Sequence, residues 1–225
     1  MPEQLRIDIN EHQSVSALVY PAGPRNRAFR TLILGHGAGA GQTSGFMVKY
    51  ATELASRGID AVTFNFFYAE QGRGAPDKND KLEACYRAVI EKVRAHKKLR
   101  GNKLAIGGKS MGGRIATQVA ASGVSELTGL VLLGYPLHPP GNPEKLRSKH
   151  LPDIKAPMLF VQGSRDTFGT LDELRPIIAK LSPPATLYVV ETGDHSFKVL
   201  KSAGVTQEEV HAAVLDEIVS WLKSR

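Results

Sequence analysis

Ser110 has the surroundings of a nucleophile, because it lies within the sequence GKSMG. A G-x-S-x-G sequence between an apolar run and a helix forms a tight strand-to-helix turn that exposes the serine hydroxyl. Residues 104–106 provide the apolar run, and apolar residues at helical spacing follow the serine as far as Ser122. At such a turn the amide of Met111 can donate to an oxyanion that develops beside the serine. The alternative interpretation is a glycine turn with a solvated serine.

A serine hydroxyl needs a base, and the base needs a group that orients it. Two side chains that qualify follow predicted strands in the chain order Ser, Asp, His. Asp166 comes after the strand predicted at 158–162, and His195 comes after the strand predicted at 187–190. Since the C-terminal ends of parallel strands lie at one edge of a sheet, we predict that His195 takes the Ser110 proton and Asp166 orients His195. Asp166 could instead cap the helix that follows it.

Other acidic and basic residues fit these two roles less well. Asp172 is expected to start a helix, and Asp194 directly precedes His195, which is a poor position for contact in the plane of the imidazole. Of the seven histidines, His195 is the one that follows a predicted strand downstream of both Ser110 and Asp166.

A second donor to the oxyanion is expected in the loop HGAGAG, which follows the strand predicted at 31–34. The small residues of this loop allow backbone amides to face the serine. We assign the role to the amide of Ala38, with the amide of Gly39 as the alternative. His36 is interpreted as a structural histidine that holds the loop.

The same glycines partly match two phosphate-binding motifs. GHGAGA fits G-x-G-x-x-A, but a dinucleotide site needs an acidic residue about 20 positions further on, at the end of the next strand. Asn65 and Phe66 stand there instead. The sequence GGKS resembles the end of a P-loop, but Lys103 occupies the position of the required first glycine. We therefore predict no cofactor and no metal ion.

The elements that must position these residues alternate along the chain, as expected for one α/β domain over residues 1–225 with a parallel sheet covered on both faces. Strands are predicted at 5–9, 15–20, 31–34, 59–67, 104–106, 127–133, 158–162 and 187–190, the first two as an edge hairpin. Helices are predicted at 46–57, 81–98, 171–181 and 207–223, in addition to the helix after Ser110. The long helix 81–98 carries Cys85 on its apolar face, so a core position is expected for this thiol.

Composition restricts the partners and the compartment. The net charge of +7 comes from separate basic clusters at 25–30, 92–103 and 145–150, without interleaved aromatic residues, so we predict solvated faces and no nucleic-acid surface. One cysteine excludes an internal disulfide. No apolar run approaches the ~18 residues that span a bilayer, and the N-terminus does not resemble a signal peptide. We predict a cytoplasmic protein without a membrane partner.

A resemblance to a known superfamily is carried by four segments and by their positions in the chain, namely GKSMG, HGAGAG, GSRD and GDHSF. Through these segments the chain resembles the α/β-hydrolase superfamily over nearly its whole length. The closest likeness is to compact dienelactone-hydrolase-like proteins, in the branch that contains testis-expressed protein homologues. This resemblance implies a mostly parallel sheet of about eight strands, with Ser110, Asp166 and His195 as a catalytic triad. Dienelactone hydrolases proper use a cysteine as the nucleophile, so the resemblance bears on the chemistry more than on the substrate.

The segment between the predicted strands at 127–133 and 158–162 is short. Cap domains of this superfamily usually lie in this segment, and residues 135–156 leave little room for one, so we expect a shallow, open site without a cap. We expect its rim to include Phe67, Tyr68, Tyr135, Leu137 and Phe168. Charged residues lie next to triad residues in sequence and favour a substrate with a carboxylate or phosphate, unless they are solvated loop charges; they are Lys109, Arg114, Arg165 and Lys198.

The sequence therefore predicts a serine hydrolase, monomeric or homodimeric, that cleaves a small ester or thioester through an acyl-enzyme on Ser110. Two alternatives remain open at this stage. One is a noncatalytic interaction module that kept the fold, because a fold does not determine a function. The other is a peptidase.

Overall fold

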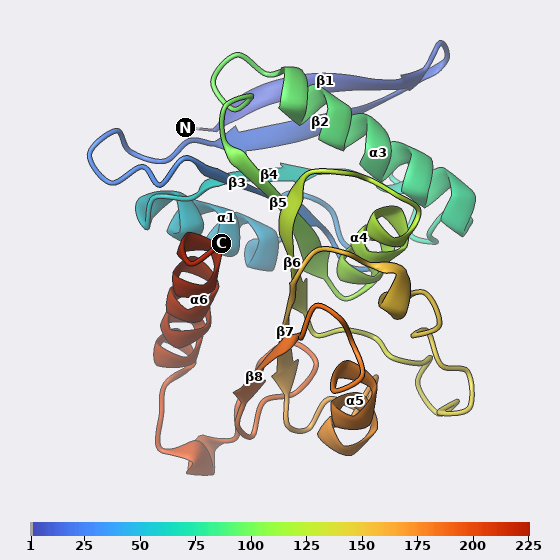
Figure 1. Cartoon of the computed structure of the whole chain (residues 1–225), viewed down its shortest axis with the longest axis vertical. Helices are drawn as coiled ribbons and strands as arrows, with labels where there is room; N and C mark the ends of the chain where they lie inside the picture. Colours follow the sequence, from blue (N-terminus) through green and yellow to red (C-terminus); the bar gives the residue numbers. More distant parts are fainter. Residues whose placement is uncertain (1) are drawn as a thin grey trace.

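A computed structural model describes residues 2–225 and contains an eight-stranded sheet in the order β1-β2-β4-β3-β5-β6-β7-β8 (Figure 1). The first two strands form an antiparallel hairpin, and β2 is also antiparallel to β4. All other neighbours are parallel, as the alternation of strands and helices predicted. The strands are β1 Glu3–Asn10, β2 Gln13–Tyr20, β3 Arg30–Gly35, β4 Asp60–Phe64, β5 Lys103–Lys109, β6 Leu127–Leu133, β7 Met158–Gly163 and β8 Thr186–Val190.

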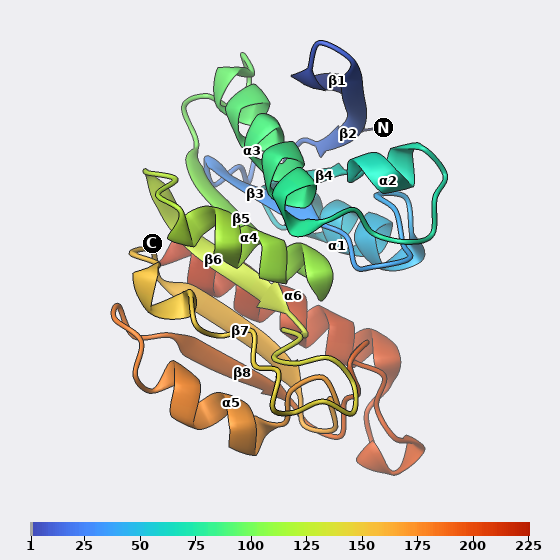
Figure 2. The ribbon, with the colours of Figure 1, turned by 90° about the vertical axis from the view of Figure 1, so that its right-hand side faces the viewer.

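Helices cover both faces of this sheet (Figures 1 and 2). One face carries α3, α4 and α5, and the opposite face carries α1 and α6. The helices are α1 Gly45–Ser56, α2 Phe67–Glu70, α3 Asn79–Ala95, α4 Met111–Ala121, α5 Leu171–Ile178 and α6 Gln207–Lys223. The fold is therefore the expected α/β fold, with a hydrophobic core on each side of the sheet.

The short central strands supply both cores, because successive side chains of a strand point to opposite faces. In β3, Ile33 packs toward α3 and α4, whereas Leu32 and Leu34 pack toward α1 and α6. All three side chains are at most 1% exposed. Because both faces of a central strand are buried, its sequence is a continuous apolar run instead of an alternation of apolar and polar residues. Cys85 lies in the first core as predicted, and its burial raises the pKa of the thiol to about 12.

The prediction of one strand over 59–67 was too long. Strand β4 ends at Phe64. The amide of Asn65 still donates to the carbonyl of Ser16 in β2, but the amide of Phe66 donates to the ring of His36 instead of to a strand. The chain therefore leaves the sheet at Phe66, and the short helix α2 follows. The periodicity of apolar residues could not show this, since Phe66 and Phe67 continue the apolar run.

The connection between β6 and β7 contains a single turn of 3-10 helix, Leu151–Asp153, and forms no separate cap domain within residues 2–225. The segment lies against α4 and over the C-terminal end of the sheet (Figure 2). Its proline-rich sequence and its length agree with the expectation of a chain without a cap.

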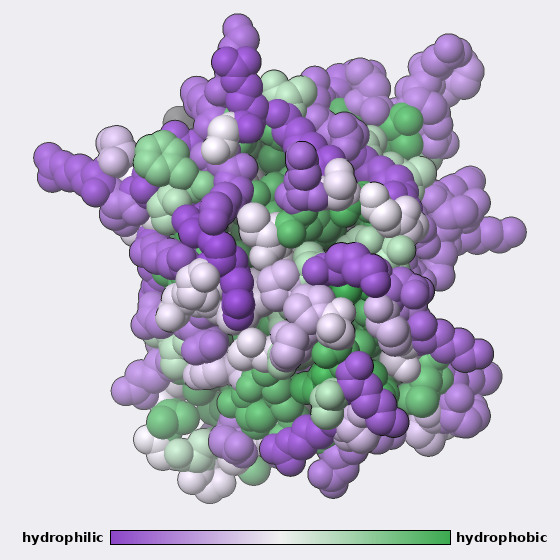
Figure 3. All heavy atoms as spheres, in the orientation of Figure 1, coloured by the Kyte–Doolittle hydropathy of each residue, from purple (hydrophilic) through white to green (hydrophobic). Residues whose placement is uncertain are grey.

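Figure 3 shows hydrophilic side chains from many segments around one face of the molecule, with hydrophobic atoms visible in smaller areas between them. The large exposed hydrophobic residues belong to different segments of the chain; they are Phe29, Val48, Leu146, Leu200 and Val205. None of the helices formed by residues 2–225 combines the length and the apolar composition that a membrane crossing requires.

Three glycines allow β3, β5 and α4 to approach more closely than side chains would permit. A Cβ added to Gly108 in β5 would lie 2.2 Å from the carbonyl oxygen of Gly35, and one added to Gly112 in α4 would lie 2.1 Å from the same oxygen. A Cβ on Gly35 itself would lie 3.0 Å from the Cα of Gly112. Gly108 also has φ +151°, which few other residues adopt. The turn at Ser110 is thus supported by direct backbone contact.

We expect Gly112→Ala to lower the free energy of unfolding by about 2–3 kcal/mol, because the added methyl group meets backbone that cannot move aside. Urea denaturation measures this change. Gly45→Ala is the matched control, since a Cβ at that position of α1 has no heavy atom within 4 Å. The control should leave stability unchanged or raise it by less than about 1 kcal/mol. Equal stability of the two variants would contradict the close approach.

Candidate active site

Ser110 occupies the turn between β5 and α4, at the C-terminal edge of the sheet. Its backbone has φ 50° and ψ −115°, a conformation that is strained for a residue with a side chain. The amide of Ser110 donates to the carbonyl of Leu133 at 2.9 Å, which holds the turn against the end of β6. The strained backbone is thus held from two sides, by this bond and by the glycine contacts beneath it.

The structure brings the three predicted residues together. The Ser110 hydroxyl lies 2.8 Å from Nε2 of His195, and Nδ1 of His195 lies 2.8 Å from Oδ2 of Asp166. Asp166 follows β7 and is fully buried, whereas the side chain of His195 follows β8 and is 21% exposed. With Nδ1 donating to the carboxylate, Nε2 is free to accept the proton of the serine hydroxyl. This arrangement can activate a serine for attack on a carbonyl carbon.

Gln162, which no sequence motif indicated, holds the carboxylate of Asp166. Its Nε2 donates to Oδ2 of Asp166 at 2.9 Å and to the carbonyl of Gly169 at 3.0 Å, and its Oε1 accepts from the amide of Tyr135 at 2.8 Å. The other carboxylate oxygen of Asp166 accepts from the amide of Phe168 at 2.9 Å. A polar residue within the apolar run of a buried strand was the signal that could have identified Gln162.

The ring of His195 is positioned by its neighbours as well as by Asp166. Phe168 stacks on the imidazole, with 4.2 Å between ring centroids and 22° between the planes. Gly134, at the end of β6, leaves room for the histidine, because a Cβ there would lie 3.4 Å from Cε1 of His195. The carboxylate of Asp194 accepts from the amides of Ser196 and Lys198 and so shapes the loop instead of contacting the imidazole.

Lys109 lies beneath the His195 loop. The expectation that its side chain faces a substrate is therefore wrong. Its Nζ donates to the carbonyl oxygen of His195 at 2.7 Å and lies 5.8 Å from the ring centroid of Phe197. The residue is 9% exposed, and burial lowers the pKa of its ammonium group to about 8, although the charges of Asp166 and Asp194 act in the opposite direction. Lys109 therefore joins the strand that carries the serine to the loop that carries the histidine.

The loop after β3 lies beside Ser110, as the expected oxyanion site requires. A Cβ added to Gly37 would be 3.7 Å from the Cβ of Ser110. The amide of Ala40 donates to the carbonyl of Gly37 at 3.2 Å, so Ala38 and Gly39 are the central residues of a turn, with φ +71° at Gly39. Within residues 2–225, the amides of Ala38 and Met111 make no hydrogen bond, so both are available to a ligand. The amide of Gly39 is instead directed at the buried hydroxyl of Tyr68.

His36 holds this loop in the manner expected of a structural histidine. The fully buried ring donates from Nδ1 to the carbonyl of Gly37 at 2.8 Å and accepts the amide of Phe66 at Nε2, at 3.1 Å. These two bonds require the neutral tautomer with the proton on Nδ1. Burial lowers the pKa of His36, in agreement with a neutral ring that links the loop after β3 to the end of β4.

The predicted rim was wrong at three positions. Tyr135 and Leu137 are at most 1% exposed, because the Tyr135 hydroxyl donates to the carbonyl of Arg147 and both side chains belong to the core. Tyr68 is also fully buried and packs against the ring of His36. Phe67 is half-buried near the end of the β1–β2 hairpin. Phe168 is the predicted rim residue that contacts His195.

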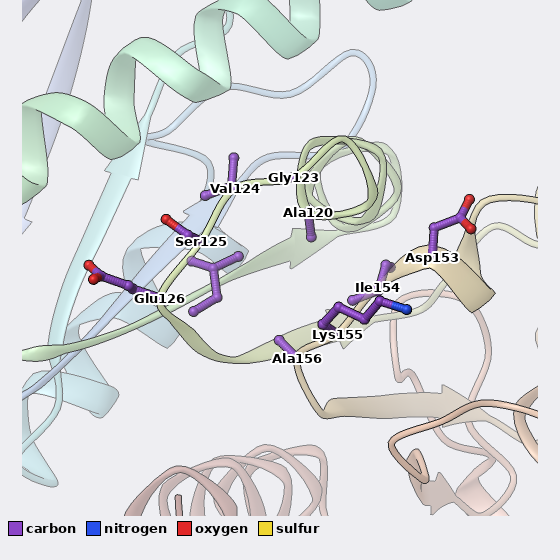
Figure 4. A pocket seen from close by; sticks show the side chains of 10 residues that line it. Ala120, Gly123, Val124, Ser125, Glu126, Asp153, Ile154, Lys155 and Ala156 are labelled. Atoms are coloured by element: carbon purple, nitrogen blue, oxygen red, sulfur yellow. The ribbon is translucent and has the colours of Figure 1, made fainter.

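A separate cavity of about 250 Å³ lies at the opposite end of the sheet (Figure 4). It is lined by the end of α4, the start of β6 and the segment 153–156, so it faces away from Ser110. No group of three or more histidine, cysteine, aspartate or glutamate side chains gathers into a metal site in the part of the chain that the structure describes.

The sequence profile of a family described as alpha/beta hydrolase domain matches residues 28–223. The match includes every strand from β3 to β8 and the three residues that meet at the sheet edge. The matched region therefore excludes only residues 1–27, which contain the β1–β2 hairpin, and residues 224–225. The narrower likeness to the branch of testis-expressed protein homologues stays a prediction.

Solved structures from several organisms align with nearly the whole chain. A lidless alpha/beta serine hydrolase from Xanthomonas campestris has 21% identity over 99% of this chain and 92% of its own, with a TM-score of 0.73. A dienelactone hydrolase from Anabaena variabilis has 15% identity over 98% of this chain and 96% of its own, with a TM-score of 0.76. An esterase from Pyrococcus furiosus has 17% identity over 99% and 92%, with a TM-score of 0.72. At these identities the likeness shows a common fold.

We expect Gln162→Leu to lower the free energy of unfolding by about 2–5 kcal/mol, because the buried carboxylate of Asp166 and the backbone of Tyr135 and Gly169 lose their partner. Urea denaturation at neutral pH measures the loss. Gln4→Leu on the exposed face of β1 is the control and should change stability by less than about 0.5 kcal/mol. A Gln162→Leu protein as stable as the parent would show that these bonds contribute little.

The buried ammonium of Lys109 should make stability depend on pH. Its pKa is about 8 in the folded chain against an ordinary 10.5, so the folded state bears the full cost of the buried charge below pH 8. That cost is relieved as the pH rises from about 8 to 10.5, because the unfolded chain then binds more protons. We expect the stability of the parent to rise relative to Lys109→Met by about 2–3 kcal/mol over this interval. A difference that does not vary with pH would refute the assignment.

Proposed function

The chain belongs to the alpha/beta hydrolase domain family, and from this premise we propose that it is a serine hydrolase that cleaves a small ester or thioester through an acyl-enzyme. The observation that carries the proposal is the pair of 2.8 Å contacts that join Ser110 to His195 and His195 to Asp166. The unbonded amides of Ala38 and Met111 beside the serine support it, because acyl transfer needs donors for an oxyanion.

In the first step, Oγ of Ser110 attacks the acyl carbon while Nε2 of His195 takes the hydroxyl proton. The carbonyl oxygen becomes an oxyanion and accepts hydrogen bonds from the amides of Met111 and Ala38, with Gly39 as the alternative to Ala38. Asp166 keeps the imidazole in the required tautomer and stabilises the imidazolium by its charge. The tetrahedral intermediate then expels the alcohol or thiol, which leaves with the proton from Nε2.

The second step repeats this chemistry with water as the nucleophile. His195 takes a proton from water, the hydroxide oxygen bonds to the acyl carbon, and the bond to Oγ breaks. The proton held on Nε2 returns to Ser110, and the carboxylic acid product leaves. Because the connection after β6 forms no cap, water and substrate have direct access to the site, which suits a small substrate.

We expect Ser110→Ala to lower kcat for a short-chain nitrophenyl ester by about 10⁴–10⁶-fold, because the members of a triad act as a unit. His195→Ala should lose a similar factor. Asp172→Ala, in the first turn of α5, is the control and should retain activity within about twofold of the parent, since it lies outside the triad. Comparison of oxygen esters with the matching thioesters then identifies the preferred leaving group.

Labelling with a fluorophosphonate separates a hydrolase from a noncatalytic module. The parent should form a covalent adduct on Ser110 that intact-protein mass spectrometry detects, and Ser110→Ala should not. Folded parent protein that remains unlabelled and leaves all esters uncleaved would show that the chain kept the fold without the activity.

A further inference from the structure

A second cavity, of about 390 Å³, lies on the α3–α4 side of the sheet and is lined by basic residues. It is formed by the start of α3, by α4 and by the connection between β6 and β7, which lie together in Figure 2. Four basic residues, two side-chain amides and one leucine line it, and no acidic residue does; the basic ones are Arg114, Arg147, Lys149 and His150. Such a lining attracts anions.

Arg114 lies one helical turn after Ser110, to whose carbonyl its amide donates at 3.0 Å. Its guanidinium group donates to two neutral oxygens, Oε1 of Gln118 and Oδ1 of Asn79, each at 3.2 Å. Its Nε is buried and has no hydrogen-bond partner within residues 2–225. A buried unpaired donor is costly, so an acceptor brought to this atom would stabilise the guanidinium group.

Arg147 is held in position through its backbone. Its amide donates to the carbonyl of Leu137 at 2.7 Å, and its carbonyl accepts the hydroxyl of Tyr135 at 2.7 Å. Its guanidinium group makes neither a hydrogen bond nor an ion pair with any residue from 2 to 225. The buried Tyr135 therefore fixes the segment, and the charged group that it carries remains available to a ligand.

The positive charges of Arg114 and Arg147 oppose each other at this cavity, and His150 beside them is kept neutral. Burial and the charge of Arg147 lower the pKa of Arg114, and burial and the charge of Arg114 lower the pKa of His150. The carboxylates of Glu83 and Asp153 act in the opposite direction, but neither lines the cavity. Several other arginines instead pair with a carboxylate, namely Arg6, Arg27, Arg57, Arg73, Arg87 and Arg94.

We propose that this cavity is a binding site for a carboxylate or phosphate group, held by Arg114 and Arg147. Guanidinium groups bind such planar or tetrahedral anions through several parallel hydrogen bonds, and a bound anion would also relieve their mutual repulsion. A rise of 1.5 Å per residue separates the backbone of Arg114 from that of Ser110 by only ~6 Å. The anion can therefore be part of the molecule that Ser110 attacks, and this part of the inference rests on the proposed function.

The first arm of the test needs no catalysis. Inorganic phosphate is titrated into the protein by calorimetry in 0.15 M NaCl, where nonspecific attraction is screened. Arg147→Gln should weaken phosphate binding by about tenfold, which corresponds to the loss of one charged contact. Arg114→Lys keeps the charge and removes Nε, so it should weaken binding as well. The matched control is Arg175→Gln on the exposed face of α5, which should change binding by less than about twofold.

The second arm compares two nitrophenyl esters of similar length, the neutral butyrate and the anionic hemisuccinate. If the anion belongs to the substrate, Arg147→Gln should lower kcat/KM for the hemisuccinate by about tenfold and leave that for the butyrate within about twofold. If phosphate binding falls and the ratio of the two esters does not, the site serves a free anion.

These outcomes separate the two proposals. Phosphate binding that depends on Arg147 in a protein that cleaves neither ester would overturn the hydrolase and retain the anion site. The proposal of an anion site would be overturned if the parent bound no phosphate. It would also be overturned if Arg175→Gln weakened phosphate binding as much as Arg147→Gln does. Neither result depends on the esterase activity.

Discussion

The constraint on which the rest of the structure depends is the contact of bare backbone among Gly35, Gly108 and Gly112. Side chains at these positions would separate β3, β5 and α4 by the width of a methyl group, and the turn that carries Ser110 would open. The positive φ of Ser110 persists because the glycines and the bond to Leu133 hold the turn. A strained serine in turn exposes its hydroxyl to His195, so the geometry of the site is a consequence of packing beneath it.

From that point a continuous chain of hydrogen bonds joins the ends of four strands, β5, β8, β7 and β6. It runs from Ser110 through His195 and Asp166 to Gln162, whose amide is bonded to the segment after β6. Lys109 adds a second connection between β5 and the loop after β8, because it extends from the end of β5 to the carbonyl of His195. Each member is buried or half-buried, so thermal motion of one strand end relative to another is opposed by bonds in a low-dielectric environment.

Much of this could be predicted from the sequence, and the reasons are local. Strand and helix periodicity located nearly every element, and the turn chemistry of GKSMG located the serine. The error at β4 arose because an apolar run cannot reveal that His36 captures the amide of Phe66. The errors at Tyr68, Tyr135 and Leu137 have a common cause. An aromatic or aliphatic residue after a strand can face solvent or the core, and only the path of the following loop decides between them.

The sequence alone determined the order of the elements, the residue types with catalytic chemistry and the edge of the sheet where Ser110, Asp166 and His195 would follow their strands. Only the tertiary structure decided that their atoms lie within hydrogen-bond distance, that Gln162 and Lys109 hold them, and that Arg114 and Arg147 share a cavity without a carboxylate. The physical reason is the range of the interactions. Periodicity and turn preferences act over a few residues, whereas hydrogen bonds, burial and charge repulsion depend on distances between segments far apart in the chain.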